Sequence, residues 1–505
     1  MTTSFVTTAI PYVNARPHLG FAYELVLADV LARHRRRRGR DVRLFTGTDD
    51  HSLKNVVAAA REGITPRALV DRNAAAFRAL GPLLGAAADD FFETSRDPRH
   101  RTAVDWLWRR CAASGDLYRK QWTGRYCAGC EAFVDDDVAI CDEHGTTPEP
   151  VSEDNWFFRL SRWREPVRDA IESGRIAILS EAARAETLAF LGGDVRDLSV
   201  SRVATRSQGW GIPVPDDPDQ VIYVWFDALA SYVASLGLGG NEALLDRYWR
   251  TATDRVHVIG KGITRFHAAY WPAFLLSAGL PLPDRIAVHG YLTVDGEKIR
   301  KSGRIVEVEP VVAECGVDAL RWYFARRCRT RVDSDVTRAA IIDAHDRDLS
   351  DGLGNLVHRC TTLAATLCAG RAPAPCDTTD AGALRAAAEA LPARVDAALD
   401  AFVLDEAAAA IVRLVDLANR TLERAEPWRV RRTDPAAAAA SLYAPLEAAR
   451  IAAGELAPFV PEIARTIASR LGTTELASSW GRLAPGTELP IGPPPVPRKT
   501  SRVDI

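Results

Sequence analysis

The feature that most constrains this chain is a strand, a loop, a helix and a second strand within its first fifty residues. Residues 5–9 (Phe-Val-Thr-Thr-Ala) have the β-branched and aromatic content of a buried strand. Pro11 and Pro17 end that strand, and residues 21–38 continue as a helix. Residues 41–46 (Asp-Val-Arg-Leu-Phe-Thr) then form a second buried strand. Two strands joined by a helix make a βαβ unit, so we expect an α/β fold with ligands at the carboxyl ends of its strands.

Polar side chains in the two loops of this unit are candidates for a ligand site. His18 and Gly20 precede the helix, where free backbone N–H groups and the helix dipole favour a phosphate. Asp49 follows the second strand, so its loop lies beside the first and its carboxylate suits a substrate ammonium group. Each has an alternative interpretation, with His18 as a surface histidine and Asp49 as the N-cap of a helix that begins near Leu53.

Basic residues further along the chain predict a second phosphate contact. Residues 221–226 are apolar and are predicted to be a strand, and 255–259 and 285–288 are predicted to be two further strands. The last of them precedes the loop Lys298-Ile-Arg-Lys-Ser302. Its two lysines and its hydroxyl can clamp the phosphates of a nucleotide. The alternative is a solvated basic turn.

Four potential metal ligands lie in an irregular, Trp-rich segment between the predicted strands. The pairs Cys127-Ala-Gly-Cys130 and Cys141-Asp-Glu-His144 have equal spacing. Together they complete a tetrahedral Cys3His set, which predicts one closed, structural zinc site. The alternatives are four unrelated side chains or a disulfide, and a reducing compartment disfavours the disulfide.

The second half of the chain has a different composition. Beyond Ser350 it is rich in Ala, Leu, Arg and Glu with helical periodicity, which predicts an all-α domain to about Arg470. Asn355 and Arg359 are four residues apart and therefore share one helix face, and Trp428 lies among arginines at a helix boundary. Aromatic rings and polar side chains of this kind read single-stranded RNA bases. The alternative is a buried tryptophan with a capping asparagine.

Length and charge limit the class of protein. A chain of 505 residues is too long for one core, and 47% hydrophobic with 26% charged residues is typical of globular proteins. No apolar run is long enough to span a membrane and no export leader precedes the first strand, so we expect a cytoplasmic protein. The formal net charge of −2 gives no overall attraction to nucleic acid. No further module follows the Pro-rich end, so we expect a monomer.

The order of these motifs resembles that of the class I aminoacyl-tRNA synthetases, and in detail that of the methionyl-tRNA synthetases. The resemblance extends to about Arg432 and includes three further segments: Gly47-Thr-Asp-Asp-His51, Tyr223-Val-Trp-Phe-Asp-Ala228 and Gly260-Lys-Gly-Ile-Thr-Arg-Phe-His267. It implies a Rossmann-type parallel-sheet catalytic domain with a zinc-knuckle connective-peptide insert, followed by an all-α anticodon-binding helix bundle. The implied parts are residues 1–95 with 221–290 (catalytic domain), 96–220 (insert), 291–350 (stem-contact region with the lysine loop), 351–488 (anticodon-binding domain) and 489–505 (Pro-rich tail).

The resemblance also implies an activity and its cofactors. Such an enzyme activates methionine with ATP and Mg²⁺ to methionyl-adenylate and transfers it to the 3′ end of methionine tRNA, and it carries one structural Zn²⁺. A methionine pocket must bury a flexible thioether against aromatic surface, because sulfur–aromatic contacts and desolvation distinguish methionine from other apolar amino acids.

Matching positions assign roles to individual residues. The implied catalytic residues are His18, Lys298, Lys301 and Arg202, and His18, Gly20 and Lys301 bind ATP. The implied methionine-binding residues are Ile10, Tyr12, Asp49, Trp225, Ala228, Tyr232 and His289. The zinc ligands are Cys127, Cys130, Cys141 and His144, and the anticodon readers are Asn355, Arg359 and Trp428. For Arg202 the alternative is a solvated arginine on an exposed loop.

Several residues depart from the family pattern, all at the expected ATP site. Phe21 replaces a second histidine, Gly262 replaces an aspartate expected to hold the ribose, and Ile299 with Arg300 alters the Lys-Met-Ser-Lys-Ser signature. Loss of one transition-state donor typically costs about 3 kcal/mol. Two other functions therefore stay open: a catalytically weakened tRNA-binding or regulatory paralogue, and an adenylating ligase outside translation. The presence of the anticodon residues argues against the second.

Overall fold

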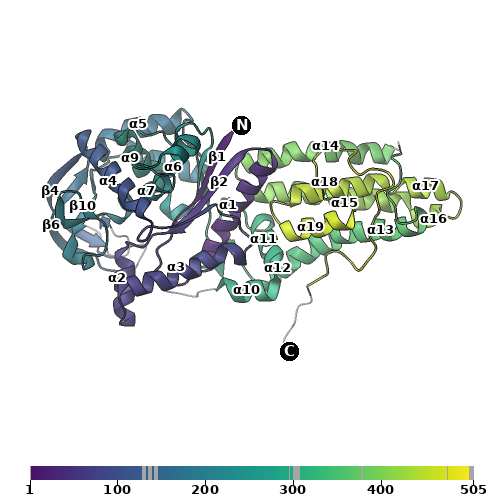
Figure 1. Ribbon diagram of the computed structural model, residues 1–505, viewed down its shortest axis with the longest axis horizontal. Helices are drawn as coiled ribbons and strands as arrows, with labels where there is room; N and C mark the ends of the chain where they lie inside the picture. The colour runs from purple at the N-terminus through teal and green to yellow at the C-terminus, as the bar shows by residue number, and fades with distance from the viewer. Residues whose placement is uncertain are drawn as a thin grey trace. The chain divides into compact units, whose positions relative to one another are not determined.

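The chain forms two compact units. The structure is a computed structural model that describes residues 2–127, 132–134, 139–141, 146–294, 296–299, 307–376, 379–474 and 476–499. One unit comprises Met1–His289 with Lys301–Glu307, and the other comprises Gly290–Arg300 with Val308–Ile505 (Figure 1). The first is built on a parallel sheet and the second is mostly helical.

A six-stranded sheet forms the centre of the first unit. Its strand order is β3-β2-β1-β12-β13-β7, and every pair in it is parallel. The strands are β1 (Thr3–Thr8), β2 (Asp41–Thr48), β3 (Asp90–Glu93), β7 (Ala177–Ile178), β12 (Arg255–Gly260) and β13 (Arg285–His289). The predicted Rossmann-type sheet is confirmed, and Figure 1 shows β1 and β2 side by side.

Helices cover both faces of this sheet. The chain passes from β1 to β3 through α1 (Leu19–Arg37), α2 (Leu53–Glu62) and α3 (Pro66–Leu83), and α1 packs on β1, β2 and β12. The aromatic residues Phe5, Phe45 and Phe92 are buried in one cluster with α4 (Pro98–Ala113), α7 (Val224–Ala234) and α9 (Trp271–Ala278). The sheet is therefore apolar on both faces, as a parallel sheet requires.

The segment predicted as an insert forms an antiparallel sheet of order β5-β4-β6-β8. Its strands are β4 (Leu117–Cys127), β5 (Ala132–Val134), β6 (Glu149–Phe158) and β8 (Leu198–Ser199), accompanied by α5 (Leu160–Glu172) and α6 (Glu181–Gly192). A short sheet of β9 (Ser201–Val203), β10 (Pro213–Val214) and β11 (Asp217–Ile222) follows. The segment does not stand apart from the parallel sheet, because β7 lies within it and pairs with β13.

The predicted strand at residues 221–226 is wrong in its second half. The strand β11 ends at Ile222, and α7 begins at Val224 with Trp225 and Phe226 in its first turn. The run from Val221 to Ala234 is almost continuously apolar, so its periodicity cannot separate a buried strand from a buried helix. The consequence for the site is that Trp225 and Ala228 project from one helix.

After α7 the chain returns to the parallel sheet. It passes through α8 (Ala243–Leu245) and the π-helical turn η2 (Asp246–Arg250) into β12. The turns η3 (Lys261–Ile263) and η4 (Phe266–Tyr270) then lead into α9. The predicted helix from Arg265 to Ala278 is therefore confirmed, with a π-helical first half.

The second unit begins with a small sheet and continues as helices. The sheet contains β14 (Leu292–Val294), β15 (Glu297–Lys298) and β16 (Ser334–Asp335). The helices are α10 (Val308–Cys315), α11 (Val317–Arg326), α12 (Arg338–Ala344), η5 (His345–Gly354), α13 (Asn355–Leu367), α14 (Thr379–Asp400), α15 (Leu404–Ala425), α16 (Pro427–Val430), α17 (Pro435–Ala440), α18 (Tyr443–Leu456) and α19 (Pro461–Arg470). The predicted all-α region is confirmed.

The Pro-rich end packs on the second unit as far as it is described. Leu489 and Val496 are buried, and the Val496 carbonyl accepts a hydrogen bond from Ser350 Oγ at 2.9 Å. A Cβ on Gly354 would lie 2.9 Å from Val496, so the close approach of this segment to the helix requires glycine. The five-part division of the chain stays a prediction.

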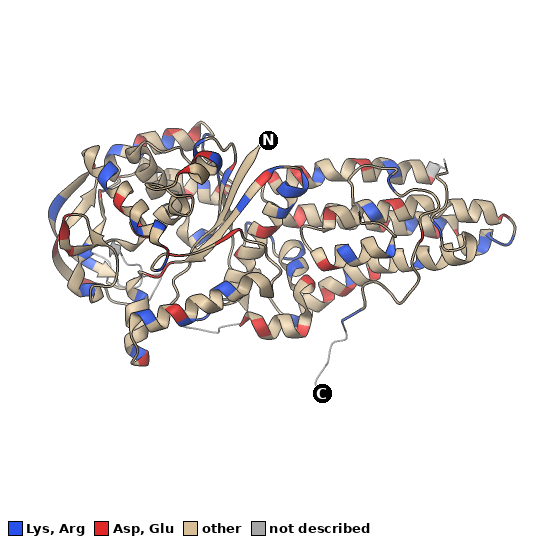
Figure 2. Ribbon diagram, in the orientation of Figure 1, with Lys and Arg blue, Asp and Glu red and all other residues tan. Residues whose placement is uncertain are grey.

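Charged residues of both signs occur on both units. Figure 2 shows Lys and Arg interspersed with Asp and Glu on both units. Among the described helices, none is both long and apolar enough to cross a membrane.

Candidate active site

His18 caps the first helix of the parallel-sheet unit. Its backbone is extended (φ −123°, ψ 173°), and its ring Nδ1 accepts a hydrogen bond from the Gly20 N–H at 3.1 Å. An accepting Nδ1 places the ring hydrogen on Nε2, so His18 can donate from Nε2 to an anion. A Cβ at Gly20 would lie 2.9 Å from the His18 ring, so glycine is what lets the ring fold over the helix start. His18 and Gly20 thus together form the N-terminal cap of α1.

Phe21 presents an apolar ring beside His18. The two ring centroids are 4.4 Å apart, and Phe21 contacts Phe77 of α3 edge to face at 5.1 Å. Phe21 also lines a cavity of about 150 Å³ with residues from α1, α3 and the ends of β1 and β2. Phe21 therefore supplies no hydrogen-bond donor here, and its ring packs between His18 and Phe77.

Asp49 lies where the sequence predicted it, at the carboxyl end of the second strand. It is 2% exposed, its N–H donates to the Pro11 carbonyl at 2.9 Å, and its backbone forms a bridge with Tyr12. The His51 N–H donates to the Asp49 carboxylate at 3.2 Å. The N-cap of α2 is Ser52, so the alternative role of Asp49 as that cap is excluded.

An aromatic group lies beside α7 and β12, which we call the Trp225 group: Tyr12, Trp225, Tyr232, Phe266 and His267. Trp225 stacks on Phe266 with 3.7 Å between centroids and contacts Tyr12 and His267 edge to face at 6.3 Å. Of the other predicted methionine-binding residues, Ala228 is buried one turn after Trp225 in α7, and Ile10 is half-buried against the same core. The structure thus joins three of the predicted residues, Tyr12, Trp225 and Tyr232, in one aromatic group.

His267 was not predicted as a site residue, although it belongs to the Trp225 group. Its Nδ1 donates to the Ile263 carbonyl at 3.0 Å, so its Nε2 accepts from the Tyr232 hydroxyl at 2.7 Å. Burial lowers the pKa of His267 to about 4, which keeps the ring neutral and this tautomer fixed at neutral pH. The segment from Gly260 to His267 is part of the family resemblance. The contact of His267 with Tyr232 could not be predicted from it, because the sequence does not show how the chain turns between Gly260 and His267.

The predicted residue His289 has a different partner. Its Nε2 contacts Glu24 Oε2 at 2.9 Å, and its ring packs on Tyr23 with 5.2 Å between centroids. Glu24 also accepts from the N–H groups of Ala9 at 2.8 Å and Gly260 at 3.1 Å. One carboxylate in α1 thus holds the carboxyl ends of β1, β12 and β13 together. Glu24 is the second residue that sequence reasoning missed, and a carboxylate within an apolar helix stripe was the available signal.

Arg202 is not a solvated loop arginine. It is 7% exposed on β9, and its Nη1 donates to the Ser201 carbonyl at 2.7 Å and to Ser199 Oγ at 2.9 Å. Its guanidinium lies over the Tyr223 ring at 4.5 Å. It lines a pocket of about 40 Å³ with His51, which follows β2.

Several predicted residues lie outside the described residues. These are Lys301, Cys130 and His144, together with the side chain of Lys298. The backbone of Lys298 is described and pairs with Thr293 of β14. Cys127 and Cys141 are described and buried, and both contact Thr146: Cys127 Sγ lies 3.9 Å from Thr146 Oγ1, and the Cys141 N–H donates to the Thr146 carbonyl at 2.9 Å.

The predicted anticodon residues lie on α13 and α16 of the second unit. Asn355 is exposed and Arg359 is half-buried on α13. The Arg359 guanidinium lies 5.5 Å from the centroid of the half-buried Trp428 ring and 3.4 Å from Glu423. Two of the three predicted residues are therefore in contact.

Comparison with known proteins identifies the family. The sequence matches the family described as tRNA synthetases class I (M) over residues 4–142 and 137–361, and the anticodon binding domain of methionyl tRNA ligase over residues 373–491. It is 38% identical to the methionine–tRNA ligase of Brucella suis, with 98% of this chain and 97% of that protein covered. The chain belongs to the methionyl-tRNA synthetases. It is therefore a class I methionine–tRNA ligase.

Further relatives support this assignment over the whole chain. The methionine–tRNA ligase of Mycobacterium bovis is 39% identical, with 96% of both chains covered. The structure of Mycobacterium tuberculosis methionyl-tRNA synthetase in complex with methionyl-adenylate matches with a TM-score of 0.93 and 37% identity, covering 99% of this chain and all of that one. The apo form of the same synthetase matches with a TM-score of 0.87. The match therefore extends over nearly the whole chain.

Proposed function

We propose that this synthetase activates methionine with ATP at the carboxyl ends of β1, β2 and β12, and then transfers it to methionine tRNA. In the first step a methionine carboxylate oxygen attacks the α-phosphorus of ATP, and pyrophosphate leaves. In the second step a hydroxyl of the terminal tRNA ribose attacks the carbonyl carbon, and AMP leaves. The observation that carries the proposal is the Trp225 group beside Asp49, because it joins a sulfur-compatible aromatic surface to a carboxylate for the ammonium group.

Methionine would be held at its two ends. The buried carboxylate of Asp49 pairs with the ammonium group, while Tyr12, Trp225 and Tyr232 enclose the thioether, with Ile10 and Ala228 beside them. We assign the polar contact near the thioether to His267, because it is the histidine bonded to Tyr232. His289 instead holds Glu24 and thereby the ends of three strands. The Tyr232 hydroxyl donates its hydrogen to His267 and therefore cannot donate it to the substrate. The pocket thus offers no strong donor from Tyr232 that would favour a polar side chain over the thioether of methionine.

The phosphates would lie at the start of α1. His18 would donate from Nε2, and the positive end of the α1 dipole would add to the attraction for a phosphate. Lys298 and Lys301 would neutralise the charge that develops on pyrophosphate, and Arg202 would contribute a further positive charge. Mg²⁺ enters as the counter-ion of ATP. Binding both substrates here would align the methionine carboxylate with the α-phosphorus of ATP and the leaving pyrophosphate. Such alignment is a large part of catalysis in displacement reactions.

One structural Zn²⁺ would be held by Cys127, Cys130, Cys141 and His144. The two described ligands fit this assignment, because both cysteines are buried and both contact Thr146. When bound, the ion would cross-link the tip of β4 and thereby stabilise the insert.

The anticodon of methionine tRNA would be read by Asn355, Arg359 and Trp428, since a ring flanked by a guanidinium can stack on an unpaired base. We expect the enzyme to act as a cytoplasmic monomer.

Methionine-dependent exchange of label between pyrophosphate and ATP tests the first step. Exchange that requires methionine and falls by about tenfold or more in Asp49→Asn supports the proposal, because a charge-assisted hydrogen bond of this kind is worth roughly 1.5–3 kcal/mol. No exchange with any amino acid would overturn it.

A second candidate function is favoured by the packing of Phe21. A ring wedged between His18 and Phe77 cannot donate to a phosphate, and Gly262 offers no carboxylate to a ribose. This combination supports a weakened, tRNA-binding or regulatory synthetase. Binding of methionine tRNA without any exchange would select this alternative.

A further inference from the structure

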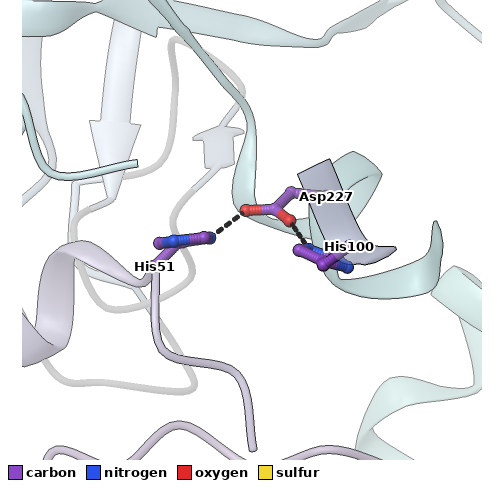
Figure 3. A group of neighbouring side chains, drawn as sticks. All are labelled: His51, His100 and Asp227. Carbon is purple, nitrogen blue, oxygen red and sulfur yellow. Dashed lines mark hydrogen bonds and ion pairs between the residues drawn. The ribbon is translucent and has the colours of Figure 1, made fainter. Parts of the chain in front are cut away.

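Three side chains from separate elements meet at one carboxylate, which we call the Asp227 bridge. Asp227 is buried in α7, His100 is buried in α4, and His51 follows β2 (Figure 3). Asp227 Oδ2 accepts from His51 Nδ1 at 2.7 Å, and Oδ1 accepts from His100 Nε2. Because a carboxylate only accepts, both of these ring nitrogens carry a hydrogen.

The bridge is charged as well as hydrogen-bonded. Burial would raise the pKa of Asp227, but the charges and hydrogen bonds of His51 and His100 outweigh it and hold that pKa below its ordinary value. Burial would lower the pKa of His51, and Arg67 also lowers it, but Asp227 and Asp50 outweigh both and raise it. The bridge is therefore a carboxylate between two imidazole donors.

The geometry fits hydrogen bonding better than metal binding. The three ligand atoms lie within 4.8 Å of one another. A metal ion would need all of them directed at one point about 2 Å away. Figure 3 shows instead that His51 and His100 lie on opposite sides of Asp227 and contact different oxygens. The ring nitrogens that face Asp227 each carry a hydrogen, so neither has a lone pair available to bind an ion there.

The bridge connects the two halves of the proposed methionine site. His51 donates its backbone N–H to the Asp49 carboxylate, so a shift of His51 moves Asp49. Asp227 follows Trp225 by two residues and directly precedes Ala228 on the same helix. His100 joins both to α4, whose position is set by the core. Asp227 thus links the loop that carries Asp49 to the helix that carries Trp225 and Ala228.

We propose that Asp227 is a positioning residue for methionine, which acts through His51 on Asp49 while His100 holds it in place. The inference rests on the proposed role of Asp49. Asp227 itself contacts neither substrate. Its removal is therefore expected to weaken binding of methionine and to leave binding of ATP unchanged.

The test uses Asp227→Asn in the full chain, with Asp116→Asn as the matched control. Asp116 is equally buried and accepts hydrogen bonds from Trp163, Ser277 and Arg162. It belongs neither to the Trp225 group nor to the Asp227 bridge. Both variants remove a buried carboxylate, so both are expected to lower the melting temperature. Methionine binding is measured without ATP by tryptophan fluorescence, and KM for ATP by pyrophosphate exchange. Asp227→Asn should raise the Kd for methionine by about tenfold or more, and Asp116→Asn by less than about twofold.

Conservative variants separate positioning from a general structural role. His51→Asn keeps a donor where Nδ1 stood, whereas His51→Ala does not, so the former should retain more of the methionine affinity. In a double-mutant cycle, Asp49→Asn and Asp227→Asn should be far less than additive, because they act on one contact.

Three results would count against the inference. An unchanged Kd for methionine in Asp227→Asn, with a melting temperature lowered as in Asp116→Asn, would make the bridge merely structural. Full additivity with Asp49→Asn would show that Asp227 acts by another route. An unchanged Kd in Asp49→Asn would overturn the role of Asp49 in the proposed function itself, and with it the route from Asp227.

Discussion

Single residues in this protein take their roles from neighbours that are distant in sequence. His18 differs, because its partner Gly20 lies only two residues away, and the sequence predicted both residues at the start of the helix. His267 and Glu24 could not be predicted in the same way. Their partners Tyr232 and His289 lie 35 and 265 residues away, so only the folded chain brings them together. Sequence patterns predict residue types at a site more readily than the pairs they form.

Phe21 provides the first prediction at this scale. Phe21→His should restore a donor beside His18 and raise the rate of methionine-dependent pyrophosphate exchange, by up to about 100-fold, which is the typical effect of one such donor. Phe21→Leu is the control, since it removes the same ring and supplies no donor. Equal rates in the two variants would show that Phe21 does not limit phosphate stabilisation.

The ribose contact gives a separate prediction. Gly262 is exposed in the turn η3 that follows β12, and Gly262→Asp should lower the KM for ATP without changing the KM for methionine, because a carboxylate can accept from ribose hydroxyls. Steady-state exchange measured at varied ATP checks this. A fall in both KM values would point to a change in the fold instead.

His267 gives a prediction about pH. Its pKa is about 4 in the folded chain against an ordinary value of 6.5, so the unfolded state binds more protons between these values. The free energy of unfolding should therefore fall as the pH is lowered from about 6.5 to 4, with His257, whose pKa burial also lowers, adding to the slope. His267→Gln should reduce that slope by at most about 1.4 kcal/mol per pH unit. Urea unfolding at several pH values measures it, and an unaltered slope would contradict a neutral His267.

At the scale of elements, the sequence predicted the alternation of strands and helices in the parallel-sheet unit. It did not predict where the apolar run from Val221 to Ala234 changes from strand to helix. The strands β1, β2, β12 and β13 have short apolar segments bounded by proline, glycine or charge, and all four were predicted. The run from Val221 to Ala234 has no such boundary, and the strand proposed there ends before Trp225. That error matters because α7 carries Trp225, Asp227 and Ala228 together.

The insert provides a prediction about metal. Cys127→Ser should lose the bound zinc and lower the melting temperature, because the ion would stabilise the insert that carries its ligands. Cys111→Ser is the control, since Cys111 is a buried thiol in α4 whose pKa burial raises to about 12. Metal analysis of both variants checks it, and zinc retained in Cys127→Ser would remove that residue from the ligand set.

Helices α13 and α16 provide a prediction about RNA. Trp428→Ala should raise the KM for methionine tRNA by about 10- to 100-fold, the range expected for one lost base stack, and should leave pyrophosphate exchange unchanged. Trp480→Ala is the matched control, because Trp480 is also half-buried in the same unit and packs on Tyr443. An equal effect of both variants on tRNA would indicate a loss of helix packing rather than of base reading.

At the scale of the whole molecule, the two units divide the proposed tasks. The parallel-sheet unit contains Asp49, His18 and the Trp225 group, and the helical unit contains the residues proposed to read the anticodon. Composition predicted several domains and an ordinary globular chain, because 505 residues exceed one core. It could not give the activity, which came from the order of motifs and from relatives that match nearly the full length.

The most direct test of the central claim is charging of methionine tRNA by the purified full chain, with each of the twenty amino acids supplied in turn. The account predicts esterification by methionine alone, with Asp49→Asn slower by about tenfold or more. It also predicts that tRNA bearing a different anticodon is charged poorly. Charging with another amino acid, or no charging at any concentration of methionine and ATP, would contradict it.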